Sequence, residues 1–184
     1  MTNPKIRKTL VTLHLLFAGF LTPAFLLVAI TGGNYLLGNK GTFTKTPIEL
    51  SAGAELDFGS DILRDDVIKL LDDNGIKHKF EYVRNRGNVV QLRPTSRKYI
   101  ELTQTDAGLT AHWVKPNLQA GFMELHKGHG PTLFKTYQKI VALGLIGVVL
   151  GGFLVGFLAP AYRRKTLIAT GLGAAVFIVL VWFA

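Results

Sequence analysis

The chain has 184 residues, of which 48% are hydrophobic and 20 are glycine, and its mean hydropathy is +0.30. This composition is more apolar than that of an ordinary soluble domain, so a membrane protein is the first hypothesis. The sequence contains no cysteine, which excludes disulfides, thiolate metal sites, cysteine-ligated iron–sulfur clusters and cysteine nucleophiles.

The net charge of +9 comes from basic residues that flank the apolar segments. All 12 acidic residues lie between Glu49 and Glu124, and the 13 lysines and arginines from Lys40 to Lys127 nearly balance them. The other basic residues lie at Lys5, Arg7 and Lys8, at Lys135 and Lys139, and at Arg163, Arg164 and Lys165. Because the surplus is not gathered on one folded surface, the pattern indicates membrane anchoring and argues against a nucleic-acid interface.

Residues 1–9 are predicted to be a cytoplasmic N-terminus, and residues 10–31 the first transmembrane helix. These 22 residues carry no formal charge, and a helix of that length extends about 33 Å, enough to cross a hydrocarbon core of about 30 Å. Pro23 near the middle predicts a kink. The alternative is a cleaved signal peptide, but the segment exceeds the usual apolar region of about 7–15 residues and no A-x-A site follows it.

Two further apolar segments follow the central part of the chain. Residues 132–162 are predicted to be the second transmembrane helix with its outer lead-in, and residues 166–184 the third. Residues 163–165 would form a cytoplasmic turn between them. Because basic residues are retained inside, we expect the N-terminus in the cytoplasm and Ala184 outside. Gly144, Gly147 and Gly151 predict close packing of the second and third helices.

Residues 32–131 have the composition of a soluble domain, which we expect on the outer side of the membrane. Ser60 or Asp61 can cap a helix that Gly75 ends. The apolar residues of this helix fall on one face: Leu63, Val67, Leu70 and Leu71. Alternating apolar residues then predict strands near residues 80–82, 90–92, 100–102 and 109–113, joined as two hairpins.

A second amphipathic segment, residues 117–125, leads back to the membrane and is expected to lie on the sheet or at the membrane surface. The predicted fold class is therefore membrane α-helical, with three transmembrane helices, plus a small extracytoplasmic α+β domain. The antiparallel sheet of that domain is expected to have about four strands.

Three histidines are candidate ligands for haem or a metal ion. His14 is the one ionisable side chain well inside an apolar segment, where such a group is costly to bury. His126 and His129 are three residues apart and would share a face if the backbone there is helical. The alternatives are a neutral His14 bonded to a neighbouring helix or near the headgroups, and a loop or interface role for the other two.

The predicted topology limits how these histidines could act together. His14 would lie near the inner face of the membrane and His126 near the outer face, so the two cannot ligate one haem within a single chain. A site with two histidine ligands would need a second copy of the chain or another protein. No catalytic residue is assigned, because Asp65-Asp66 and Asp72-Asp73 are explained most simply as a solvated helix face. Whether the chain is an enzyme on its own is left open.

Two short motifs and the segment between them resemble the PepSY-associated transmembrane helix family. Residues 13–19, continuing to residues 29–32, resemble the LH…G…TG helix of that family, and residues 124–130 resemble its LHxG signature. A helix followed by hairpins that end in a T-D-x-G-type turn is similar to a PepSY domain. The resemblance implies a bacterial inner-membrane protein with a periplasmic PepSY domain. Such a protein would be an accessory, regulatory or partner-binding component of a process such as iron or siderophore uptake or respiration.

The family resemblance also implies an alternative function. Larger relatives include ferrisiderophore reductases, in which histidines of membrane helices ligate b-type haem, so a haem b electron-transfer protein is the second hypothesis. These 184 residues depart from such relatives, because they contain no flavin or nicotinamide domain and no glycine-rich dinucleotide fingerprint. The expected partners are the lipid bilayer and either another membrane protein or a second copy of the chain.

Overall fold

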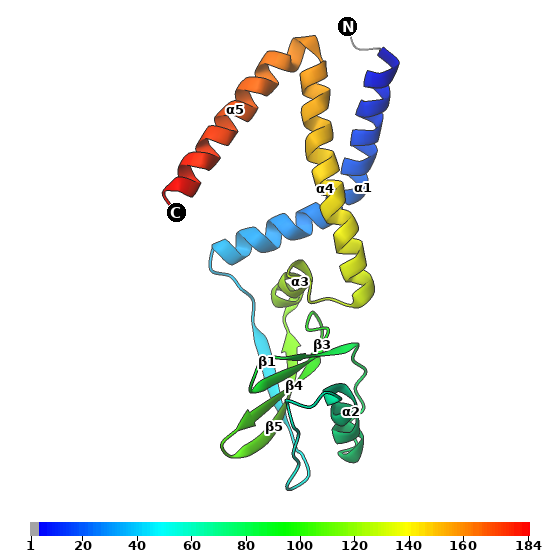
Figure 1. Ribbon diagram of the computed structural model, residues 1–184, viewed down its shortest axis with the longest axis vertical. Coiled ribbons are helices and arrows are strands. Elements are labelled where there is room, and N and C mark those ends of the chain that lie inside the picture. The colour runs from blue at the N-terminus through cyan, green and yellow to red at the C-terminus, as the bar shows by residue number, and fades with distance from the viewer. Residues whose placement is uncertain (1–3) are drawn as a thin grey trace. The chain divides into compact units, whose positions relative to one another are not determined.

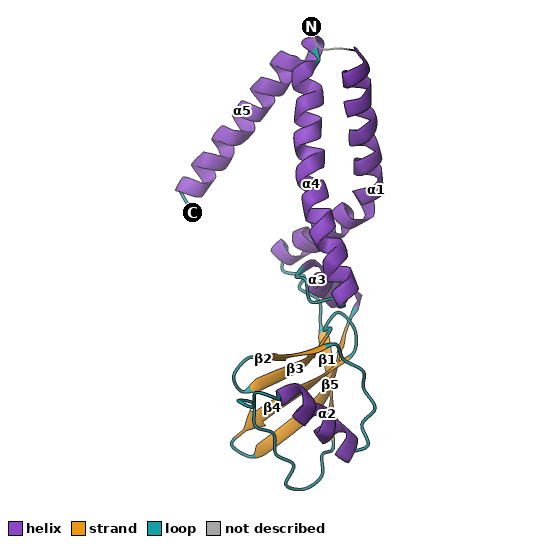
Figure 2. Cartoon of the chain, turned by 45° about the vertical axis from the view of Figure 1, so that its right-hand side comes forward, coloured by secondary structure: helices purple, strands orange, loops and turns teal. Residues whose placement is uncertain are grey.

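The computed structural model describes residues 4–184, which form five α-helices and one five-stranded sheet (Figures 1 and 2). The chain divides into two compact units. The helical unit comprises the residues up to Phe25 together with Lys139–Ala184, and the sheet unit comprises Leu26–Gln138. Each unit is described separately below.

Three helices are long and apolar enough to cross a membrane: α1 (Pro4–Leu36), α4 (Thr132–Leu158) and α5 (Pro160–Trp182). The mean hydropathy of their most apolar windows is 2.2, 2.6 and 1.9, respectively. This agrees with the predicted helical part of the fold class. Helix α1 extends beyond the predicted residues 10–31 at both ends, and Pro23 lies inside it.

The connection between the last two helices lies earlier than predicted. The break is at Ala159, whose backbone is extended (φ −86°, ψ 111°), and α5 begins at Pro160. A proline disfavours the helical conformation of the residue before it and is well suited to the first position of a helix, so it sets the break. Arg163, Arg164 and Lys165, predicted to be the turn, are instead helical residues near the start of α5.

The glycines of α4 pack mainly against α1, which corrects the predicted packing of the last two helices. A Cβ atom at Gly144 would collide with the Leu21 side chain, and one at Gly152 would lie 3.1 Å from the His14 ring. Small residues let two helices approach closely. Helix α5 meets α4 near the break, where Gly156 faces Thr166, and none of its residues is buried.

The sheet has the strand order β1-β5-β4-β3-β2, and every neighbouring pair is antiparallel. The strands are β1 (Phe43–Ile48), β2 (Tyr82–Asn85), β3 (Val89–Arg93), β4 (Tyr99–Thr105) and β5 (Gly108–Pro116). Four strands and both hairpins were predicted. The count of about four was one too low, because β1 pairs with β5 at the edge of the sheet.

Helix α2 (Leu63–Asp73) covers one face of the sheet and forms the core with it (Figure 2). Fully or nearly fully buried apolar residues from α2, β3, β4 and β5 meet there: Val67, Leu70, Leu71, Val90, Leu92, Ile100, Leu102 and Ala111. Each large aliphatic side chain buried in this way stabilises the fold by about 1.5–3 kcal/mol.

The two ends of α2 differ in how well the sequence predicted them. Gly75 follows the helix with a φ of +66°, and the Ile76 and Gly75 amides donate to the Leu71 and Asp72 carbonyls, so glycine ends the helix as predicted. At the other end, the N-cap is Ile62, which makes no side-chain cap bond. The Ser60 hydroxyl accepts from the Ile62 amide instead and donates to Asp66.

Helix α3 (Leu118–His126) follows β5 and contributes Glu124 to the pocket on the face of the sheet opposite α2. Asn117 caps it, as its side-chain oxygen accepts a 2.8 Å hydrogen bond from the Ala120 amide. The residues that α3 buries are Ala120, Gly121, Met123 and Glu124. Its outer side carries Leu118 and Phe122, which are 74% and 40% exposed.

Candidate functional site

The face of the sheet opposite α2 brings charged residues together through strand register. On this face Lys45 of β1 is paired with Val114 of β5, and Val114 with Tyr99 of β4. In the next row Glu101 of β4 is paired with Gln91 of β3. Residues paired directly across antiparallel strands point to the same face, as do residues two apart on one strand. Arg93, two residues after Gln91, therefore joins the same cluster.

A continuous chain of hydrogen bonds links these side chains. Lys45 Nζ donates to Glu101 Oε1 over 2.6 Å, and Gln91 Nε2 donates to Glu101 Oε2 over 3.0 Å. Arg93 Nη2 donates to Gln91 Oε1, and Arg93 Nη1 donates to Thr95 Oγ1, both over 2.9 Å. The Thr95 hydroxyl donates to Glu124 Oε2 over 2.5 Å. The network thus ties β1, β4 and β3 to α3.

Glu124 is the point at which α3 and the following loop close the network. Its Oε2 lies 2.7 Å from His129 Nδ1 and 3.8 Å from Arg93 Nη1, and its Oε1 lies 3.5 Å from Lys127 Nζ. Arg93 is 2% exposed and Glu124 is 8% exposed. A buried ion pair of this kind is sensitive to the loss of either partner, because the remaining charge is then left uncompensated.

These residues line a pocket of about 290 Å³, called the polar pocket below. It contains Lys45, Gln91, Arg93, Tyr99, Glu101, Glu124, Lys127 and His129, together with Phe43, Arg86 and Val114. Three hydrogen-bonding groups in it have no partner among residues 4–184: the buried Nε of Arg93, the hydroxyl of Tyr99 and the guanidinium of Arg86. An unpaired donor identifies a position at which a ligand atom would be stabilised, and of these three groups the Nε of Arg93 is the buried one, where the lack of a partner is costly.

The electrostatics of the polar pocket favour ionised carboxylates. Burial alone would raise the pKa of Glu124, but hydrogen bonds from Thr95 and His129 outweigh it, so the pKa lies below its usual value. The pKa of Glu101 is lowered in the same way, since hydrogen bonds from Gln91 and Lys45 outweigh burial. Burial, followed by the nearby Glu101 and Glu124 charges, raises the pKa of Tyr99, which therefore keeps its proton as a donor.

Burial also lowers the pKa of the two basic groups beside Glu124, Arg93 and His129. It lowers the pKa of Arg93, against the attraction of Glu124, and a guanidinium nevertheless stays charged near neutral pH. Burial lowers the pKa of His129 as well, although the Glu124 hydrogen bond opposes this. The Nδ1–H of His129 donates to the Glu124 carboxylate, which can only accept.

The structure does not bring His126 and His129 into one site. Helix α3 ends at His126, and Gly128 has a φ of +74°, so His126 and His129 do not share a helical face. His126 Nδ1 lies 2.8 Å from the Thr31 hydroxyl on α1, whereas His129 contacts Glu124. Within residues 4–184, no three His, Asp or Glu side chains are grouped so that they could hold a metal ion.

His14 lies in an apolar pocket between α1 and α4. The pocket has a volume of about 450 Å³ and is lined by apolar residues of both helices, among them Phe17, Leu21, Gly147 and Gly151. The Nδ1 atom of His14 is buried and has no hydrogen-bond partner among the described residues. Of the three predicted histidines, His14 therefore retains an unsatisfied ring nitrogen.

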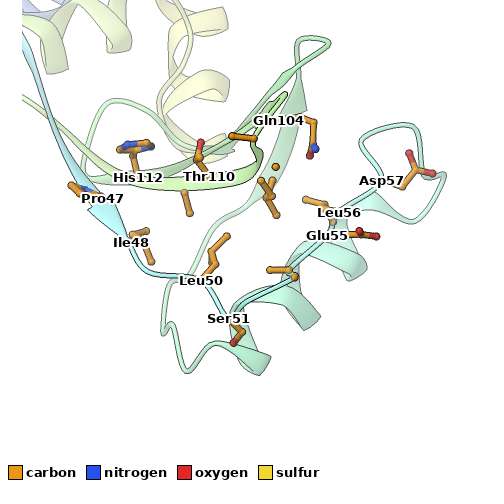
Figure 3. A pocket seen from close by; sticks show the side chains of 16 residues that line it. Pro47, Ile48, Leu50, Ser51, Glu55, Leu56, Asp57, Gln104, Thr110 and His112 are labelled. Atoms are coloured by element: carbon orange, nitrogen blue, oxygen red, sulfur yellow. The ribbon is translucent and has the colours of Figure 1, made fainter.

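A second cavity in the sheet unit, the hairpin groove, lies beside the β4–β5 hairpin (Figure 3). Its volume is about 630 Å³. One wall is the segment after β1, which contributes Leu50, Glu55, Leu56 and Asp57, and the other is β5 with Thr110 (Figure 3). Strand β1 pairs with β5 only from Ala111 onward, so residues 108–110 of β5 have no strand neighbour on this side.

Sequence reasoning did not identify the polar pocket. Strand alternation was used only to place apolar residues, and the segment 117–125, expected on the sheet or at the membrane surface, was not linked to Arg93 or Glu101. One signal was present. Tyr99-Ile100-Glu101-Leu102 places large apolar residues at both odd and even positions, which is typical of a strand covered on both faces.

Comparison with models of known protein families, with curated proteins and with solved structures finds no significant match to this chain.

Proposed function

We propose that this chain is an integral membrane protein that crosses a bacterial inner membrane three times and holds its sheet unit in the periplasm. The observation that carries the proposal is the apolar surface of the helices. None of the 23 residues of α5 is buried, yet the mean hydropathy of its most apolar window is 1.9. An exposed apolar surface of this extent is stable in lipid and not in water.

The direction of insertion rests on charge. Lys5, Arg7 and Lys8 lie at the start of α1, and Arg163, Arg164 and Lys165 near the start of α5. Basic residues next to membrane helices are retained in the cytoplasm. Both basic clusters are cytoplasmic if the N-terminus is inside, the segment between α1 and α4 is periplasmic and the C-terminus is outside.

Within this topology the sheet unit acts as a partner-binding module, so the protein is an accessory or regulatory component of a membrane process. The motif resemblance to PepSY-associated proteins points to iron or siderophore uptake or to respiration. The hairpin groove supports partner binding, since the unpaired edge of residues 108–110 can accept an extended segment as an added strand. Glu55 and Asp57 at the groove favour a segment with basic side chains.

Purification of the full chain in mild detergent from its native membrane, followed by identification of co-purifying subunits, tests this function. We expect a stoichiometric membrane partner, and we expect Glu55→Lys to reduce its recovery at least tenfold by reversing the charge at the groove. Asp106→Lys is the matched control, because Asp106 lies in the same hairpin but does not line the groove. Equal recovery with both variants would contradict binding at the groove, and the absence of any partner would contradict the module.

A haem b electron-transfer protein is the second candidate function, and His14 is the observation that favours it. Its unsatisfied Nδ1 in an apolar pocket suits one axial ligand, and the ring packs directly against Gly151 and Gly152 of α4. The fit is incomplete within one chain, because residues 4–184 offer no second histidine in that pocket. A second copy or a partner would have to supply it. Bound haem would supply one-electron transfer.

The visible spectrum separates the two candidates. Haem binding predicts a Soret band in the purified chain that His14→Ala removes and that His112→Gln, a change outside the apolar pocket, leaves intact. A colourless preparation with its native lipids retained would end the haem hypothesis.

A further inference from the structure

We infer that the polar pocket is a binding site for a phosphate group carrying about two negative charges. Four cationic side chains line the pocket, namely Lys45, Arg86, Arg93 and Lys127, against the two carboxylates Glu101 and Glu124. The pocket therefore has a surplus of two positive charges when His129 is neutral. A phosphate monoester carries about −1.5 to −2 at pH 7, which matches this surplus, whereas a carboxylate ligand supplies only one charge.

The two pocket carboxylates already have hydrogen-bond and ion-pair partners, so they are not free to bind a further cation. Glu101 accepts from Lys45 and Gln91, and Glu124 accepts from Thr95 and lies against His129 and Lys127. The donors that remain are the Nε of Arg93, the Tyr99 hydroxyl and the guanidinium of Arg86, for which no hydrogen bond or ion pair is present. Free donors with satisfied acceptors are the arrangement that an oxyanion requires.

The position and size of the pocket restrict the ligand further. A volume of about 290 Å³ is at the lower end of ligand pockets, so the ligand is a phosphate with a small organic group or the headgroup of a lipid. The lipid source is compatible with α3, which supplies Glu124 and carries the exposed Leu118 and Phe122. Both sources present the same chemistry to Arg86, Arg93 and Tyr99.

Calorimetric titration of the detergent-purified full chain with sn-glycerol 3-phosphate tests the soluble source. We expect saturable binding that weakens with salt, and at least tenfold weaker binding of sn-glycero-3-phosphocholine, a phosphodiester whose single negative charge is offset by its choline group. The lipid source is tested in nanodiscs. Phosphatidate added to phosphatidylcholine should raise the unfolding temperature of the sheet unit above its value in phosphatidylcholine alone. Binding in either arm supports the site and identifies its source, and binding in neither arm overturns it.

Substitutions test whether phosphate binding depends on the residues of the polar pocket or on general surface charge. We expect Arg86→Gln to weaken binding about tenfold and Tyr99→Phe to weaken it severalfold, because each removes a donor without breaking the network. Arg84→Gln is the matched control, since Arg84 is an exposed arginine of neighbouring β2 that does not line the pocket. Equal loss in Arg84→Gln and Arg86→Gln would overturn the assignment, as would phosphodiester binding equal to that of the monoester.

Discussion

Glu124 holds α3 to the sheet through its charge, which makes the stability of the sheet unit depend on pH. Its pKa is lowered below the usual value of 4.5 because hydrogen bonds from Thr95 and His129 outweigh burial. A carboxylate with a lowered pKa contributes stability above its unfolded pKa, and this contribution is lost as the pH falls through the folded pKa. We therefore expect the unfolding temperature to fall as the pH is reduced below about 4.5.

The variant Glu124→Gln isolates this effect. It should lower stability at pH 7 by roughly 1–3 kcal/mol, because the amide leaves part of the network unsatisfied, and it should flatten the dependence on acid pH. Fluorescence of Trp113, which packs against the core, reports unfolding of the sheet unit. Asp106→Asn, at an exposed turn, should behave as the wild type. An unchanged acid profile in Glu124→Gln would contradict the assigned role of Glu124.

Thr31 and His126 form a second polar link, which joins α1 to α3 inside the sheet unit. The Thr31 hydroxyl donates to the Leu27 carbonyl over 2.6 Å, so its oxygen accepts from His126 Nδ1–H. Thr31→Val keeps the shape but removes the acceptor, and we expect a loss of about 1 kcal/mol. Hydrogen exchange of residues 118–126 should increase. Thr22→Val, which removes only an exposed bond to Ala18 in the same helix, should leave that exchange unchanged.

At the scale of elements, Gly41 is the residue that lets the chain between α1 and β1 pass α3. Its φ is +76°, and a Cβ atom there would collide with the backbone of Ala120. Backbone atoms cannot move aside as a flexible side chain can. An alanine in the left-handed conformation costs about 1–2 kcal/mol by itself. Because of the added collision, Gly41→Ala should destabilise the sheet unit by about 2 kcal/mol or more beyond that cost.

Gly87 provides the matched control for that substitution. It has the same φ of +76°, but a Cβ atom there would meet nothing within 4 Å. Gly87→Ala therefore measures the cost of the backbone conformation, and the difference between the two variants measures the collision with α3. Thermal unfolding followed by Trp113 fluorescence gives both values. Equal destabilisation by the two variants would show that Gly41 does not pack against α3.

The elements that could be predicted were those whose pattern is local. Alternation identified β3, β4 and β5, and Gly75 identified the end of α2. Strand β1 was missed because Thr44, Lys45, Thr46 and Pro47 carry no apolar alternation, and its pairing with β5 joins residues far apart in sequence. The break at Ala159 follows from Pro160, which was read as part of the second span because its surroundings are apolar.

The site was harder to predict than the elements, because it depends on which surfaces meet. Arg93, Glu101 and Glu124 come from three separate segments, and nothing near any one of them in sequence indicates the others. The network exists because Glu124 of α3 and His129 of the following loop meet Arg93 and Thr95 at the end of β3. His126 and His129 were singled out as candidate haem or metal ligands, and their partners, Thr31 and Glu124, could be found only from the fold.

At the scale of the whole molecule, the absence of cysteine allows the proposed topology to be tested one position at a time. Asp106→Cys in the β4–β5 turn should react in intact spheroplasts with a maleimide that cannot cross the membrane, because the sheet unit is proposed to be periplasmic. Lys165→Cys near the start of α5 should react only after the membrane is permeabilised, since basic residues there are retained inside. Ala184→Cys should react from outside, because α5 is long enough to cross the bilayer once. Labelling of Lys165→Cys in sealed spheroplasts, or protection of Asp106→Cys, would contradict the topology on which the periplasmic binding module depends.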